Sequence, residues 1–181
     1  MSHRAPQWSH QIPVSLACVI ALACAISGCA GEEERDYAIP RELCGYSFTP
    51  DDLAGFLPPG KEIAVRRDVH SVTTVCEVVI DRKLILTTTT TWRGADDSTE
   101  SFARRALKVP KHSADGGRFR YSDFEAFGKT RKCVAPEGGR VLYTAVQAVG
   151  SKQRDADAMK RLITSFTAEV EASRECTAGV P

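Results

Sequence analysis

The sequence predicts an α+β domain in which an antiparallel sheet is sandwiched by helices, preceded by an N-terminal leader and a flexible tether. Residues 61–92 hold three β-rich runs joined by short polar corners, which is typical of an antiparallel meander. Residues 159–170 carry an apolar stripe at helical spacing. The expected order of helix, strands, helix, strands and helix indicates an α+β fold rather than alternating βα units.

The first 28 residues have the character of an export leader. Residues 12–26 are uncharged and mostly apolar, and they follow a short start that contains Arg4. This run is shorter than the roughly 20 apolar residues that a spanning helix needs. Its end, Ile26-Ser27-Gly28-Cys29, resembles the bacterial lipobox, in which small residues fit a peptidase cleft and the cysteine thiolate accepts an acyl chain.

We therefore expect cleavage before Cys29 and acylation of Cys29, for example with palmitate. Two chains or more would hold the protein stably on the outer face of a cell membrane. Ordinary signal-peptide cleavage after a small residue and a retained signal anchor are the alternatives.

The segment after the leader predicts a spacer. Residues 29–42 are small, polar and acidic, without apolar periodicity, so we expect a flexible tether there. One monomeric domain is expected over residues 43–176, followed by a disordered C-terminus at 177–181. The chain has 24 Lys and Arg against 23 Asp and Glu, and Arg4 leaves with the leader, so the mature protein carries no net charge. This balance argues against a nucleic-acid partner.

The first half of the domain predicts a short helix and then three strands. Thr49-Pro50-Asp51-Asp52 offers a capping oxygen, a proline in the first turn and acids at the positive end of the helix dipole. Pro58-Pro59-Gly60 would end that helix. We expect strands over residues 62–68, 71–80 and 83–92, where β-branched residues are dense.

The second half predicts two helices and four strands. Asp97 and Glu100 have capping-box spacing for a helix that Pro110 closes. Residues 111–117 are expected to form a loop, and residues 119–121, 124–127, 131–135 and 140–149 to form strands, with a hairpin turn at 136–139. The last helix would pack on the sheet through Met159, Leu162, Ile163, Phe166 and Val170.

The cysteines predict two disulfides. Of the seven, Cys18 and Cys24 lie in the leader and Cys29 would be acylated. An even set in an exported chain is typical of disulfides, with free buried cysteines as the alternative. The four that remain are Cys44, Cys76, Cys133 and Cys176. Of three possible connectivities we favour Cys44–Cys76 with Cys133–Cys176, which keeps each bridge within one half of the domain.

Catalytic, metal and cofactor sites have little support in the sequence. Beyond the leader only His70 and His112 remain, without a partner at metal-ligand spacing, and there is no glycine-rich phosphate loop or dinucleotide fingerprint. His112, Ser113 and Asp115 could compose a catalytic triad, but adjacency in a loop does not supply its geometry. We expect no enzyme, no metal site and no cofactor.

A basic segment is the main candidate for binding. Residues 104–140 hold ten bases and four acids, with aromatic residues interleaved. Such a segment could form a groove for an anionic wall polymer or a lipid headgroup. The alternative is a solvated strand face over core aromatics. The candidate ligand-binding residues are Arg118, Arg120, Arg131 and Lys132.

A family resemblance follows from the order of these features. The order begins with the lipobox and the polar tether, followed by Cys44 just before the Thr-Pro-Asp-Asp-Leu helix. It continues with Cys76 in a β-rich run, Cys133 before a Gly-Gly hairpin, and a terminal helix. It resembles small actinobacterial cell-envelope lipoproteins of unassigned function, which are related to extracellular sensor domains of membrane kinases. The resemblance covers residues 41–176, although that group has its fourth cysteine near the start of the last helix, whereas Cys176 follows the end of that helix. It implies an α+β sandwich and no established chemistry.

Three functional hypotheses remain from the sequence. The leading one is a membrane-anchored module that binds or senses an envelope component on the extracytoplasmic side. The alternative is a structural lipoprotein that binds a protein partner, and a cell-wall hydrolase is the least favoured. Besides the membrane itself, the expected partner is an anionic envelope polymer, a lipid or a protein.

Overall fold

The computed structural model describes residues 35–104, 106 and 109–178. The leader, the lipobox and Cys29 lie outside the described residues, as do residues 179–181. Cleavage before Cys29 and acylation of its thiol therefore stay predictions.

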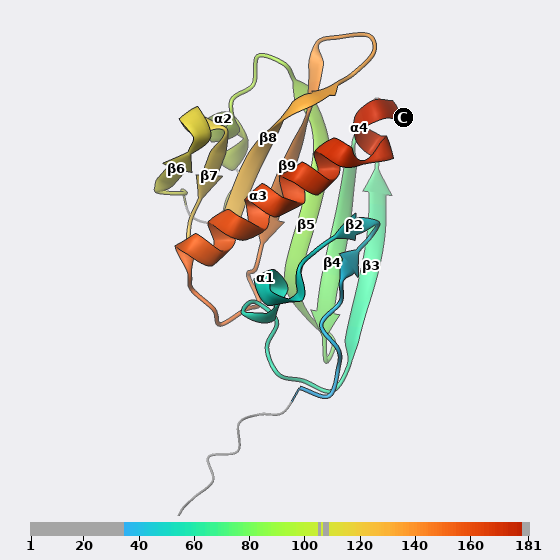
Figure 1. Cartoon of the computed structure of the whole chain (residues 1–181), viewed down its shortest axis with the longest axis vertical. Coiled ribbons are helices and arrows are strands. Elements are labelled where there is room, and N and C mark those ends of the chain that lie inside the picture. Colours follow the sequence, from blue (N-terminus) through green and yellow to red (C-terminus); the bar gives the residue numbers. More distant parts are fainter. Residues whose placement is uncertain (1–34, 105, 107–108, 179–181) are drawn as a thin grey trace, which may run out of the picture. The chain divides into compact units, whose positions relative to one another are not determined.

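Within the described residues, seven strands form one antiparallel sheet in the order β3-β4-β5-β9-β8-β7-β6 (Figure 1). A small hairpin of β1 (Glu42–Leu43) and β2 (Tyr46–Ser47) is separate from it. The antiparallel arrangement and the α+β class agree with the sequence prediction. The strands are β3 (Ile63–His70), β4 (Thr73–Ile80), β5 (Lys83–Gly94), β6 (His112–Ala114), β7 (Phe119–Tyr121), β8 (Glu125–Val134) and β9 (Arg140–Gln147).

The described helices differ greatly in length. The long helix α3 (Ala156–Ala172) lies across one face of the sheet, and its five predicted apolar residues are all buried (Figure 1). The others are α1 (Pro50–Ala54), α2 (Thr99–Ala103) and α4 (Arg174–Ala178). No helix of the described part is long and apolar enough to cross a membrane.

The two faces of the sheet are covered by different helices. Along β9, Leu142 and Val146 belong to the core under α3, whereas Tyr143 and Ala145 join a second cluster on the opposite face. Phe102 of α2 packs edge to face on Tyr143 in that second cluster, with ring centres 5.6 Å apart. Helices therefore cover both faces, as predicted, but α2 covers only the part near β7 and β8, with Phe102 reaching Tyr143 of β9.

The prediction of a flexible tether is wrong for residues 35–42. Tyr37 is buried and its hydroxyl donates to the carbonyl of Pro58. The backbone of Arg35 forms an isolated parallel β-bridge with that of Gly60. The folded part therefore includes residues 35–42, which the prediction placed in the tether. One aromatic residue in a polar segment gives no periodic signal, so the sequence pattern missed this anchor.

Several short elements also differ from prediction. Helix α2 is capped by Ser98, whose Oγ accepts from the Ser101 N–H, rather than by Asp97. At α1, Thr49 makes no capping bond and instead donates its hydroxyl to Asp52. The strands expected at 124–127 and 131–135 are the single strand β8, and the loop expected at 111–117 contains β6. The last helical residues 177–178 belong to α4 rather than to a disordered end.

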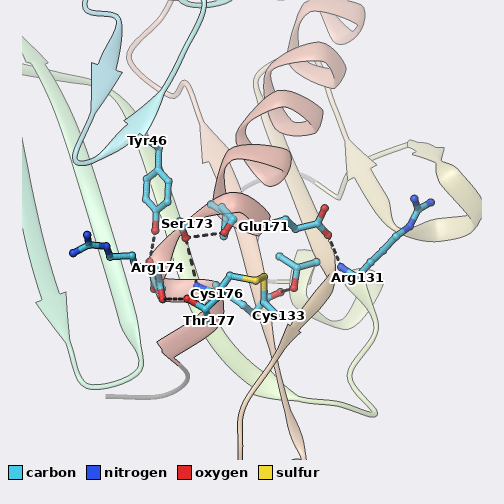
Figure 2. The surroundings of a disulfide bond; sticks show 12 residues. Tyr46, Arg131, Cys133, Glu171, Ser173, Arg174, Cys176 and Thr177 are labelled. Atoms are coloured by element: carbon cyan, nitrogen blue, oxygen red, sulfur yellow. Dashed lines mark hydrogen bonds between the residues drawn. A yellow bond between two sulfur atoms is a disulfide. The ribbon is translucent and has the colours of Figure 1, made fainter.

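The four cysteines form the favoured pairs. Cys44 is bonded to Cys76, which ties the β1–β2 hairpin to β4, with Cα atoms 6.0 Å apart. Cys133 is bonded to Cys176, which ties α4 to β8, with Cα atoms 4.6 Å apart (Figure 2). Each bridge thus ties a short element to a long strand of the sheet.

Candidate functional site

A polar cleft of about 390 Å³ brings together three segments of the chain. They are residues 97–99 at the start of α2, residues 115–118 in the turn before β7, and residues 129–131 of β8. We call this feature the Asp115 cleft. Two of the four predicted binding residues, Arg118 and Arg131, line it.

The turn at Asp115 shapes one wall of the cleft. Asp115, Gly116 and Gly117 all have positive φ, at 52°, 63° and 92°. Glycine adopts this left-handed conformation without a steric penalty, which explains the Gly-Gly pair in the sequence. The turn leaves the Asp115 carboxylate at hydrogen-bond distance from the guanidinium groups of both cleft arginines.

Arg118 is held on several sides. Its side chain is only 15% exposed, and its guanidinium donates to Asp115 at 3.2 Å and to Glu171 of α3 at 2.9 Å. Its Nε donates to the Lys129 carbonyl, and the cation lies 4.7 Å from the Phe119 ring centre. Arg118 therefore joins α3, β7 and β8, and it serves the fold more than a ligand.

Arg131 is the accessible arginine of the cleft. Its side chain is 62% exposed, and its Nη2 donates to both carboxylate oxygens of Asp115, at 2.8 and 2.7 Å. Its backbone N–H donates to Glu171. The guanidinium is thus positioned at the edge of the cleft while it still faces solvent.

Lys129 supplies a third cation. Its Nζ donates to the carbonyls of Ala95 and Asp97 at 2.8 and 2.9 Å, and lies 5.3 Å from the Tyr143 ring centre. The Asp97 carboxylate is paired with Arg93 at 2.8 Å. The cleft is consequently a mixed site in which cations and carboxylates alternate, rather than the strongly basic groove that the charge of residues 104–140 predicts.

The other two candidate residues lie elsewhere. Arg120 is half-buried in β7 opposite Phe127, and Lys132 is exposed in β8 outside the cleft lining. Phe119, Tyr121 and Phe127 are buried in the core. These rings therefore do not line a groove, because strand alternation turns them into the cores on the two faces. Their burial agrees with the alternative interpretation of a strand face over core aromatics.

Sequence reasoning missed three participants, namely Asp115 as an ion-pair partner, Lys129 and Glu171. The Asp115-Gly116-Gly117 triplet was a usable signal, because an acid before two glycines marks a tight turn with a projecting carboxylate. Glu171 carries no comparable signal. It lies 53 residues from Arg118 in the chain, and only the crossing of α3 over β8 brings them together.

Comparison with protein-family models, with curated proteins and with solved structures finds no match to this chain. The resemblance to actinobacterial envelope lipoproteins therefore stays a prediction from the sequence pattern.

Proposed function

We propose that this protein is an extracytoplasmic lipoprotein, anchored through lipid on Cys29, whose domain binds an envelope component at the Asp115 cleft. The leader that ends in Ile26-Ser27-Gly28-Cys29 supports the anchor. The two disulfides support an oxidising compartment, because such bonds persist outside the cytosol.

Binding is favoured over catalysis by the state of the charged groups. Asp115 is paired with Arg118 and Arg131, and Glu171 with Arg118. Carboxylates whose oxygens are engaged in ion pairs suit a fixed recognition surface better than proton transfer, because a general base must reach a proton of the substrate.

The ligand class follows from Arg131, whose position carries the proposal. An exposed guanidinium that is already oriented by a carboxylate loses little freedom when it binds a phosphate or carboxylate. We therefore propose an anionic wall polymer with polar, hydroxylated units, which the carbonyls and acids of the cleft can also bind.

Binding can be measured with poly(glycerol phosphate) as the probe. We expect Arg131→Gln to weaken binding about tenfold, as for the loss of one charge-assisted hydrogen bond. Arg140→Gln is the matched control, because it also removes an exposed arginine, but one outside the cleft lining. Equal affinities for the two variants would exclude the Asp115 cleft as the binding site.

The anchor is tested separately by cell fractionation. Cys29→Ala should move the protein from the membrane to the soluble extracytoplasmic fraction, whereas Cys24→Ala in the leader should leave it on the membrane. Membrane retention of the Cys29→Ala protein would contradict lipid anchoring.

A structural role in binding a protein partner is the second candidate, and the edge strand β3 favours it. Residues 65–70 are all exposed, including Val65 and Val69, so the strand could pair with an added strand. Arg66, Arg67 and Asp68 on the same strand are typical of edges that are protected from pairing, which makes this candidate the weaker one. A protein partner that no longer binds the Val69→Lys variant but still binds the Arg131→Gln variant would favour this second candidate.

A further inference from the structure

The chain enters the described domain at one end of the sheet, which we call the basal end (Figure 1). It comprises residues 35–37, 58–62, 81–84 and 149–152. Arg35 donates to the carbonyls of Ala54 and Leu57 at 3.2 and 2.6 Å, and the Asp36 N–H donates to the Gly60 carbonyl. The chain is therefore fixed to the domain from Arg35 onward.

The distance from this fixed point to the lipid site is short. Five residues separate Cys29 from Arg35, and this segment spans at most about 20 Å even when fully extended. Strand β5 has 12 residues and runs about 40 Å from the basal end to the opposite end of the sheet. If Cys29 is lipidated, as proposed above, the opposite end cannot be the part that faces the bilayer.

The basal end also carries groups that suit a lipid surface. Lys61, Arg82, Lys83 and Lys152 are exposed there. Lys83 and Lys152 line a cleft of about 360 Å³ beside Gly60. Leu84 and Val149 lie next to these cations and are 47% and 49% exposed.

Acidic groups at this end are fewer, and one is engaged within the protein. Asp81 accepts from the backbone N–H of Lys61 at 3.1 Å and of Glu62 at 3.0 Å. Asp36 and Glu62 are exposed. The basal end is thus net positive, although the mature chain as a whole is neutral.

We propose that the basal end rests on an anionic phospholipid bilayer, with its lysines at the headgroup phosphates and with Leu84 and Val149 in the interfacial layer. This inference rests on the proposed lipid anchor and adds an orientation to it. Residues 97–99 follow the far end of β5, so the Asp115 cleft would point away from the membrane toward the wall.

The orientation can be tested with the full lipidated chain reconstituted in phosphatidylglycerol vesicles whose acyl chains are brominated near the headgroup. Bromine quenches tryptophan that enters the interface. Leu84→Trp places the probe at the basal end, and Val134→Trp is the matched control at the end of β8, where Val134 is 51% exposed. Buried Trp92 is a background common to both variants. We expect at least about twofold stronger quenching for Leu84→Trp.

Equal quenching of the two variants, or stronger quenching of Val134→Trp, would overturn the proposed orientation. A chain recovered without lipid on Cys29 would instead overturn the proposed anchor, so the two failures are distinguishable. Exchange of phosphatidylglycerol for phosphatidylcholine should reduce the quenching of Leu84→Trp. Unchanged quenching in the neutral lipid would overturn the contact between the lysines and the headgroups.

Discussion

At the residue scale, the two arginines of the Asp115 cleft differ in what they do for stability. Arg118 is almost buried and is the ion-pair partner of Glu171, whose side chain is also largely covered. Arg118→Gln leaves that carboxylate without its cation, so we expect a loss of about 2 kcal/mol in the free energy of unfolding. Arg131→Gln removes an exposed pair and should cost less than about 1 kcal/mol. Urea denaturation of both variants measures the difference, and equal losses would contradict it.

Tyr46 makes stability depend on alkaline pH. Its hydroxyl donates to Glu175, and burial together with this neighbouring carboxylate raises the pKa of Tyr46 well above its usual value. In the unfolded chain the phenol ionises near its usual pKa of about 10. The folded protein therefore binds the extra proton above pH 10, and stability should fall as the pH rises beyond that point.

The Tyr46→Phe variant isolates this contribution, because phenylalanine keeps the ring that packs on Phe166 but cannot ionise. We expect its urea midpoint to decline less between pH 8 and pH 11 than that of the unmodified protein. The same decline in both proteins would show that Tyr46 is not responsible.

Residue pairings show where sequence reasoning succeeds and where it stops. The formation of two disulfides was predictable from an even number of cysteines in an exported chain. The choice among the three connectivities was not, because it depends on how the fold brings the cysteines together. Arg118 and Arg131 were named from local charge alone, but their shared partner Asp115 depends on a turn, and Glu171 depends on how α3 crosses the sheet. Local charge counts cannot reveal carboxylates that arrive from a distant helix.

At the element scale, α4 depends on tertiary contacts. A five-residue helix is too short to be stable in isolation. It is held by the Cys133–Cys176 bond (Figure 2). It is also held by Glu175, which accepts hydrogen bonds from Tyr46 and Thr90. Removal of the disulfide should therefore loosen α4 before it affects the sheet.

The two disulfides provide a matched comparison. Their loops of 43 and 32 residues predict a loss of about 4 kcal/mol for either one when both cysteines become serine. Hydrogen exchange should separate them, because only Cys133→Ser with Cys176→Ser should expose the amides of α4. Unchanged protection of α4 in that double variant would show that packing alone holds the helix.

Elements with a long periodic pattern were the predictable ones. Helix α3 and strands β4 and β5 lie where the sequence indicates, because burial repeats over several turns or residue pairs. Helix α2 ends at Ala103 and β6 has three residues, so neither offers enough repeats to show a period. Their positions are set by the strands that they contact.

At the scale of the whole molecule, the α+β class and its two covered faces were predictable, whereas the start of the domain was not. The order of apolar patterns along the chain determines the class, because each element must bury one face. The start depends on Tyr37 and Arg35, which reach Pro58, Ala54 and Leu57 through single long-range contacts. Composition alone assigned these residues to a solvated tether.

The domain start leads to a direct test by truncation. A chain that begins at Arg35 keeps the buried Tyr37 ring and the Arg35 hydrogen bonds, whereas a chain that begins at Leu43 loses both. We expect the shorter chain to be less stable by about 3 kcal/mol, from lost apolar burial and hydrogen bonds. Urea denaturation measures this difference in the free energy of unfolding. Tyr37→Ala in the longer chain should reproduce most of the loss of stability, because the Tyr37 ring contributes the largest buried area. If both truncated chains unfold at the same urea concentration, residues 35–42 contribute nothing to the stability of the fold. The tether between the lipid site and the domain would then be longer, and long enough to release the basal end from the bilayer.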